Sequence, residues 1–149
     1  MKRFFFGTAV AFAALFCCQT SAQAFNDRPV AASELPSAAQ TVLNSNFSNH
    51  RIALAKVETG FWGRNYDVFL ANGDKLEFDR RGSWTEIVCR EGGVPTQLVP
   101  VAITAYLNSA YPGVKLVKIE REGGRYEAKL ANGMEFTFDK RFRVVEVDD

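Results

Sequence analysis

Hydrophobic and polar residues along this 149-residue chain follow a pattern that occurs twice. Apolar residues recur at helical spacing in two short segments, Leu35, Ala39, Val42, Leu43 and Phe47, and then Val99, Ile103, Tyr106, Leu107 and Ala110. Each segment predicts a short helix with one apolar face that needs a sheet to pack on. Pro36 and Pro100 favour a helix start, because a proline in the first turn removes no intrahelical hydrogen bond.

After each predicted helix the hydrophobic period changes from about 3.6 residues to about 2, which is typical of β-strands. Strands are expected at 52–58, 65–71, 74–79 and 84–88, and again at 115–120, 125–131, 134–139 and 143–147. Asn72-Gly73 and Asn132-Gly133 predict two-residue hairpin turns, because both residue types tolerate positive φ. Gly82 suits a left-handed position in the next turn, whereas Phe142 at the matching place predicts a different turn.

The two halves of the chain also resemble each other in sequence, which predicts a tandem repeat. Residues 66–81 and 126–141 lie 60 positions apart and share 8 of 16 residues. The expected fold class is α+β: two tandem helix-plus-four-strand repeats form one continuous antiparallel sheet with both helices on one face. The expected segments are a flexible stretch at 25–33, a first repeat at 34–89, a connector at 90–97 and a second repeat at 98–149.

The amino terminus has the features of a signal peptide. A basic start, Met1-Lys2-Arg3, precedes an almost unbroken apolar run at 4–18, and Ala22-Gln23-Ala24 offers small residues where a signal peptidase cuts. We expect residues 1–24 to be removed and the protein to be periplasmic or secreted. A lipoprotein anchored through Cys17 or Cys18 stays open as the alternative.

Removal of residues 1–24 leaves 125 residues with 16 basic and 17 acidic side chains. This balance gives no electrostatic argument for binding nucleic acid or an anionic membrane surface. No further stretch is apolar enough to span a bilayer. Cys89 is then the only cysteine and is expected to be a buried small hydrophobic residue, with a reactive thiol or an intermolecular bridge as the open alternatives.

Alternation along the strands predicts an apolar sheet face beneath the helices and a charged face open to water or a partner. Phe69 and Trp84 are expected on this open face, where the second repeat has Lys129 and Val144. Large aromatic side chains on an exposed sheet are candidates for partner contacts.

An aromatic pair, Phe61-Trp62, lies between glycines in the loop ahead of the second strand. Two interpretations are open for this pair: contact with a partner, or packing back over a sheet edge or the core. The predicted partner-binding residues are therefore Phe61, Trp62, Phe69 and Trp84.

The sequence has no group of residues typical of an active site. His50 is the only histidine and has no cluster of cysteines or carboxylates near it in the sequence. Glu77 and Glu86 are expected on a water-exposed face, where their pKa values have little reason to separate. We therefore expect a protein that is not an enzyme and holds no cofactor or metal.

Taken together, these residues resemble the PepSY-like, beta-lactamase-inhibitor-protein-like family of secreted bacterial proteins. The resemblance lies in the Leu35-Pro36 and Val99-Pro100 helix starts, the Tyr-x-x-x-Leu-Ala-Asn-Gly hairpins at Tyr66 and Tyr126, and the segment 78–84. It implies one curved sheet with the helices on its convex side.

The expected function is binding of a protein or peptide on the open face, with regulation or inhibition of an envelope enzyme as one form of it. A small-ligand-binding or envelope-structural role is the alternative, because a fold does not by itself transfer a function.

Overall fold

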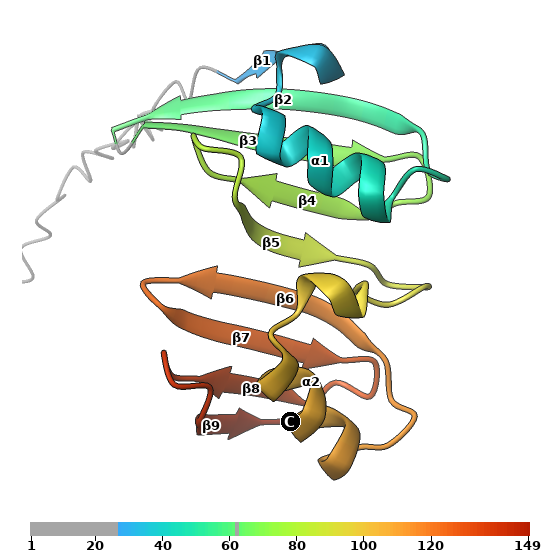
Figure 1. Cartoon of the computed structure of the whole chain (residues 1–149), viewed down its shortest axis with the longest axis vertical. Helices are drawn as coiled ribbons and strands as arrows, with labels where there is room; N and C mark the ends of the chain where they lie inside the picture. Colours follow the sequence, from blue (N-terminus) through green and yellow to red (C-terminus); the bar gives the residue numbers. More distant parts are fainter. Residues whose placement is uncertain (1–26, 62) are drawn as a thin grey trace, which may run out of the picture.

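The computed structural model describes residues 27–61 and 63–149, so the expected signal peptide lies outside the described residues. One antiparallel sheet of nine strands dominates the fold, and its strands are ordered in space as in the chain (Figure 1). The strands are β1 Arg28–Pro29, β2 Ile52–Gly60, β3 Gly63–Leu70, β4 Lys75–Phe78, β5 Trp84–Val88, β6 Leu116–Glu122, β7 Arg125–Leu130, β8 Glu135–Phe138 and β9 Val144–Asp148. The α+β class and the continuous antiparallel sheet are confirmed.

Both helices lie over the same face of the sheet (Figure 1). The first, α1 (Ser37–Asn46), covers strands of the first half, β2–β5, and the second, α2 (Val101–Ala110), covers strands of the second half, β6–β9. Two short 3₁₀ helices, η1 Ala32–Glu34 and η2 Thr96–Leu98, precede them.

A single buried cluster joins the helices to both halves of the sheet. The helices contribute Ala39 and Leu43 from α1 and Ile103 and Leu107 from α2, as the helical spacing predicted. The largest fully buried side chains come from the sheet: Phe78, Phe136 and Phe138. Burial of such a side chain stabilises the fold by about 1.5–3 kcal/mol. Helices as short as α1 and α2 are only marginally stable alone, so they depend on packing against the sheet.

The segment expected to be flexible contains an additional strand. Arg28 of β1 lies opposite Val57 and Pro29 lies opposite Lys56, and the Val30 N–H donates to the Ala55 carbonyl at 2.9 Å. No strand was expected in this part of 25–33. Two residues are too few to produce a period-2 pattern, and the strand is held through backbone hydrogen bonds.

The Asn-Gly hairpins have three-residue loops and not the two-residue turns expected. In the first, the Leu70 N–H donates to the Asp74 carbonyl and the Gly73 N–H to the Leu70 carbonyl. Gly73 has a φ of 90°, and Asn72 is not among the positive-φ residues. Asn72 acts through its side chain instead, because its Oδ1 accepts the Asp74 N–H at 3.1 Å.

The turn that leads into β9 matches the turn that leads into β5, contrary to expectation. The Phe142 N–H donates to the Asp139 carbonyl at 2.8 Å, as the Gly82 N–H does to the Asp79 carbonyl at 2.9 Å. Phe142 adopts a left-handed φ of 60°. Its ring lies 5.5 Å from that of Tyr126, so side-chain packing offsets the backbone strain.

A β-bulge at the start of β5 reverses the direction of its first side chain. Glu77 lies opposite Glu86, but Phe78 lies opposite Trp84, so Thr85 is an extra residue. Trp84 therefore faces the helices and is only 8% exposed. The placement of Trp84 on the open face was wrong, because simple alternation cannot register an extra residue.

The same bulge occurs at the start of β9, where Val144 lies opposite Phe138. Val144 packs against the core and not on the open face, whereas Val145, expected in the core, is 54% exposed. Val147 faces the helices but is 48% exposed, because β9 is the last strand of the sheet.

Candidate binding surface on the open sheet face

Side chains on the face away from the helices form two rows that run across the strands. Cross-strand pairing defines the mixed row as Leu54, Phe69, Lys75, Val88, Lys118 and Lys129. It defines the acidic row as Asp67, Glu77, Glu86, Glu120 and Glu127. Like charges directly opposite each other destabilise a sheet, so the acidic row requires cations beside it.

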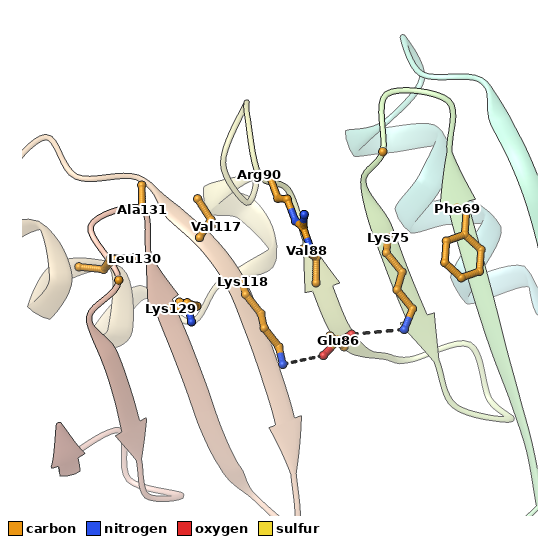
Figure 2. A pocket seen from close by; sticks show the side chains of 12 residues that line it. Phe69, Lys75, Glu86, Val88, Arg90, Val117, Lys118, Lys129, Leu130 and Ala131 are labelled. Carbon is orange, nitrogen blue, oxygen red and sulfur yellow. Dashed lines mark ion pairs between the residues drawn. The ribbon is translucent and has the colours of Figure 1, made fainter. Parts of the chain in front are cut away.

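Lysines of the mixed row supply these cations. Lys118 Nζ lies 2.8 Å from Glu86 Oε2, and Lys75 Nζ lies 3.6 Å from Glu86 Oε1 (Figure 2). Lys118 Nζ also lies 3.0 Å from Glu120 Oε2, and Lys75 Nζ pairs with Glu77. Burial lowers the pKa of Lys118, but its hydrogen bonds to Glu86 and Glu120 outweigh this and leave the pKa raised. Such partly exposed pairs contribute about 0.2–1 kcal/mol each, so they hold the face in a defined geometry more than they stabilise the fold.

Lys56 lies at one end of the acidic row, opposite Asp67. Its Nζ lies 3.1 Å from Asp67 Oδ2, 2.6 Å from Glu58 Oε1 and 2.9 Å from Asp27 Oδ2. Hydrogen bonds to Glu58 and then Asp27 raise the pKa of Lys56. Asp67 is buried, and this burial raises its pKa although Lys56 acts against it.

A hollow of about 760 Å³ lies along the mixed row (Figure 2). Phe69 and Val88 provide apolar surface within it, and Lys75 Nζ lies 5.8 Å from the centre of the Phe69 ring. Arg90 lines the same hollow and has no ion pair or hydrogen bond from its guanidinium among the described residues. The arrangement offers apolar contact beside an available cation.

The predicted binding residues are not all brought together. Phe69 lies in the hollow, on the open face as expected, whereas Phe61 lies at the tip of the β2–β3 hairpin and is 95% exposed. At a strand rise of about 3.3 Å per residue, β3 separates the two by about 20 Å. Trp62 lies outside the described residues.

Trp84 lies on the other face, at the junction of the two halves. The Arg121 guanidinium is 4.4 Å from the centre of the indole ring, and Arg121 Nε donates to the Trp84 carbonyl at 2.5 Å. The Tyr126 ring is 6.5 Å away. Trp84 therefore packs β5 against β6 and β7, and it does not line the hollow.

Comparison with known proteins identifies the family. Residues 64–146 match a family model described as beta-lactamase-inhibitor-like and PepSY-like. The chain belongs to the PepSY-like family. No curated protein matches this PepSY-like chain.

Three crystal structures of Bacteroides proteins are similar to the PepSY-like chain. A DUF2874-family protein from Bacteroides vulgatus, assigned to the periplasm, is 44% identical, with a TM-score of 0.82 over 85% of this chain and 99% of its own. A protein from Bacteroides thetaiotaomicron, assigned as calcium-regulated and periplasmic, is 39% identical, with a TM-score of 0.81 over 83% and 98%. A second Bacteroides vulgatus protein, assigned to the periplasm without a known function, is 38% identical, with a TM-score of 0.77 over 83% and 99%.

Sequence reasoning missed several residues that line the hollow, among them Val88 and Arg90. Val88 follows Glu86 by two positions, so alternation alone places it on the open face of the PepSY-like sheet. Arg90 carried no such signal, because it lies two residues beyond the end of β5 and its direction depends on the connection to α2.

The reactive side chains of the PepSY-like fold differ in their surroundings. His50 is exposed in the turn before β2, and Cys89 is 1% exposed, with its thiol pKa raised to about 12 by burial and by Asp74. Glu77 and Glu86 lie directly opposite each other, and both lie beside Lys75. Within residues 27–61 and 63–149, no three His, Cys, Asp or Glu side chains are grouped so that they could hold a metal ion. Neither described helix is long and apolar enough to cross a membrane.

Proposed function

We propose that this PepSY-like protein is a non-catalytic periplasmic binding protein that holds a protein or peptide segment on the open face of its sheet. The observation that carries the proposal is the hollow on the mixed row, where Phe69 and Val88 offer apolar surface beside the cation of Arg90. No described helix covers this face. A partner that places an apolar side chain against Phe69 and a carboxylate against Arg90 would satisfy both groups.

The open form of the hollow supports a macromolecular partner. It spreads over β3 to β7 and is a depression in the surface, not an enclosed cavity. The rows beside it are fixed by ion pairs such as Lys118 with Glu86, so the face is ordered before a partner arrives. Order before binding lowers the entropy that association costs.

The absence of catalysis in this proposal rests on the state of the reactive groups. A thiol with a pKa of about 12 is a poor nucleophile at neutral pH, and Cys89 is buried whereas His50 is exposed. Periplasmic location is supported by the signal-peptide pattern at 1–24 and by the assignment of the three Bacteroides relatives.

We also infer that the two halves are copies of one unit. In β2–β5 and β6–β9 the pairing registers agree: Tyr66 lies opposite Phe78 as Tyr126 lies opposite Phe138. The Val30 N–H donates to Ala55 as the Cys89 N–H donates to Val117, each at 2.9 Å. β1 thus stands beside β2 as β5 stands beside β6.

The test is capture of partners from envelope extract by the mature protein and by two variants. Phe69→Ala should lose the partner while keeping its thermal stability within a few degrees, because the ring lies at the surface of the hollow. Val101→Ala is the matched control, since Val101 is apolar, 84% exposed and on α2. If Phe69→Ala captures the same proteins in the same amounts as Val101→Ala, the hollow is not the binding site.

The volume of the hollow favours one second candidate, binding of a small amphipathic anion. Ligand pockets typically enclose about 300–1,000 Å³, and the hollow is about 760 Å³. Native mass spectrometry of the protein purified from its own periplasm separates the candidates. A bound small molecule that is lost in both Phe69→Ala and Arg90→Ala supports the small ligand, and a bound polypeptide supports the first proposal.

A further inference from the structure

The last strand of the sheet, β9, has an open edge. It ends the strand order, and no strand in the described part of the chain pairs with its outer side. An edge strand leaves one row of backbone N–H and C=O groups without partners. The opposite edge differs, because β1 lies along part of β2.

Strand β5 resembles β9 in geometry and shows how a further strand can pair with such an edge. Both β5 and β9 begin with the same bulge and pair in the same way with the strand before them. On its other side β5 pairs antiparallel with β6, so that Ile87 lies opposite Ile119 and Val88 lies opposite Lys118. Within residues 27–61 and 63–149, no strand takes this position beside β9.

The side chains at the β9 edge have a defined chemistry. Val147, which corresponds to Ile87, faces the helices and is 48% exposed. Glu146 and Asp148 point to the open face, and Asp149 follows them. Among the described residues none of these three carboxylates has an ion pair or a side-chain hydrogen bond, whereas Glu86, Glu120 and Glu135 on the same face each lie beside a lysine.

We propose that β9 binds an extended peptide segment of another protein as a tenth strand, whose side chains alternate between apolar and basic. The segment runs antiparallel to β9, as β6 runs to β5. An apolar side chain lies opposite Val147, and Lys or Arg side chains lie opposite Glu146 and Asp148. Backbone hydrogen bonds hold the segment, and the charges select its sequence.

The same carboxylates disfavour a second copy of this chain at the edge. Two β9 strands paired antiparallel would bring Glu146 and Asp148 of both copies together on one face, and like charges across a strand pair are destabilising. Acidic residues on an edge strand are a common defence against self-pairing. In this protein the same two carboxylates leave the β9 edge available to a strand that carries basic side chains.

The test uses a fluorescein-labelled peptide with the core sequence Val-Lys-Ile-Lys-Val, measured by fluorescence anisotropy and by amide NMR shifts of the mature protein. Binding should be saturable, with shifts concentrated in 144–149 and β8. Shifts around Phe69 in place of β9 would overturn this proposal and would favour the hollow as the binding site. The experiment therefore distinguishes failure of the β9 proposal from failure of the proposed binding at the hollow.

Two N-methylated forms of the peptide distinguish strand pairing from charge attraction. Methyl groups on the two lysine nitrogens point to one edge of the peptide strand, and methyl groups on the three apolar residues point to the other. One form should bind at least about tenfold more weakly and the other as the parent does, because only one edge donates to β9. Equal binding by both forms would mean attraction by charge alone and would overturn the proposal.

Charge-reversal variants of the protein locate the site. Glu146→Lys with Asp148→Lys should weaken parent-peptide binding at least about tenfold. The matched control is Glu91→Lys with Glu122→Lys, which makes the same change in net charge at exposed positions outside both rows of the open face and should bind like wild type. Equal losses in both variants, or a concentration-dependent dimer in sedimentation that Glu146→Lys with Asp148→Lys breaks, would contradict the proposal.

Discussion

The two turns that lead into the last strand of each half use the same hydrogen bonds but different residues. In the first half Gly82 has a φ of 82°, and in the second half Phe142 has a φ of 60° at the same place. A Cβ atom on Gly82 would lie 2.8 Å from the Ala39 nitrogen and 2.8 Å from Pro36 Cβ. The turn itself accepts a side chain, so α1, which lies on this turn, is what requires glycine.

The residues that follow these turns differ for a related reason. Trp84 is covered by Arg121 and Tyr126 because β6 and β7 continue the sheet beyond β5. Val144 has no such neighbour among residues 27–61 and 63–149, because β9 is the last strand there. The comparison teaches that the neighbouring element, more than the local turn, determines which residue each half carries.

Removal of the Trp84 side chain should have the largest effect on stability. Trp84→Ala is expected to lower the free energy of unfolding by about 3–5 kcal/mol, the usual cost of truncating a buried aromatic residue. Val144→Ala, its counterpart, should cost about 1 kcal/mol, because Val144 is only partly buried. Urea unfolding measures both, and a loss below about 1 kcal/mol for Trp84→Ala would show that its burial does not stabilise the junction.

Truncation of matched core leucines tests whether the halves unfold together. Leu70→Ala and Leu130→Ala are each expected to cost about 2–5 kcal/mol, because both side chains are buried in the one core cluster. Each variant should shift a single transition in calorimetry. Two separated transitions, each shifted by only one of the variants, would mean that the halves are independent domains.

Exchange of the turn residues separates turn strain from helix packing. Gly82→Ala is expected to cost about 1–2 kcal/mol for the left-handed backbone and about 1–3 kcal/mol for the contact with α1. Phe142→Gly relieves the first cost and loses only partial packing, so it should change stability by about 1 kcal/mol or less. Equal losses in the two variants, measured by urea unfolding, would contradict the role assigned to α1.

The smallest expected effect is the titration of Asp139. Hydrogen bonds from Arg143, first from its backbone and then from its side chain, lower the pKa of Asp139 from 3.8 to about 2. Because the folded pKa is below the unfolded one, this contribution to stability is present above about pH 4 and is lost as the pH falls through 2. Carboxyl NMR titration should show the midpoint near 2 in wild type and at a higher pH, still below 3.8, in Arg143→Ala, because this variant loses only the side-chain hydrogen bond and keeps the backbone one.

The sequence predicts the elements of this fold well and the faces of some strands less well. Period changes located both helices and eight strands, because each of these elements is long enough to show its own spacing. The bulge at Thr85 left no trace in the pattern, so Trp84 was placed on the wrong face. Phe69 was placed correctly because β3 pairs with both of its neighbours without a bulge from Tyr66 to Phe69.

The candidate site was predictable only where it depends on alternation. Lys75, Lys118 and Lys129 fall on the open face by their position in their strands. That they lie beside Phe69 and Val88 in one row depends on the registers of four strand pairs, which no single strand reveals. The position of Arg90 depends on the path of a connection, which has no period to follow.

Strand order equal to chain order has a consequence for how the sheet assembles and opens. Every pairing but two joins strands linked by a short turn, so each of these hairpins can form locally and early. The exceptions are β1 with β2 and β5 with β6, which must wait until the intervening chain with α1 or α2 has closed. Between β5 and β6, three register pairs form the seam, from Glu86–Glu120 to Val88–Lys118, and the Cys89 N–H adds a hydrogen bond to the Val117 carbonyl. Amide exchange should therefore be fastest along this seam among the inner strands. The contact between Trp84 and Arg121 joins β5 to β6 and opposes the opening of the seam.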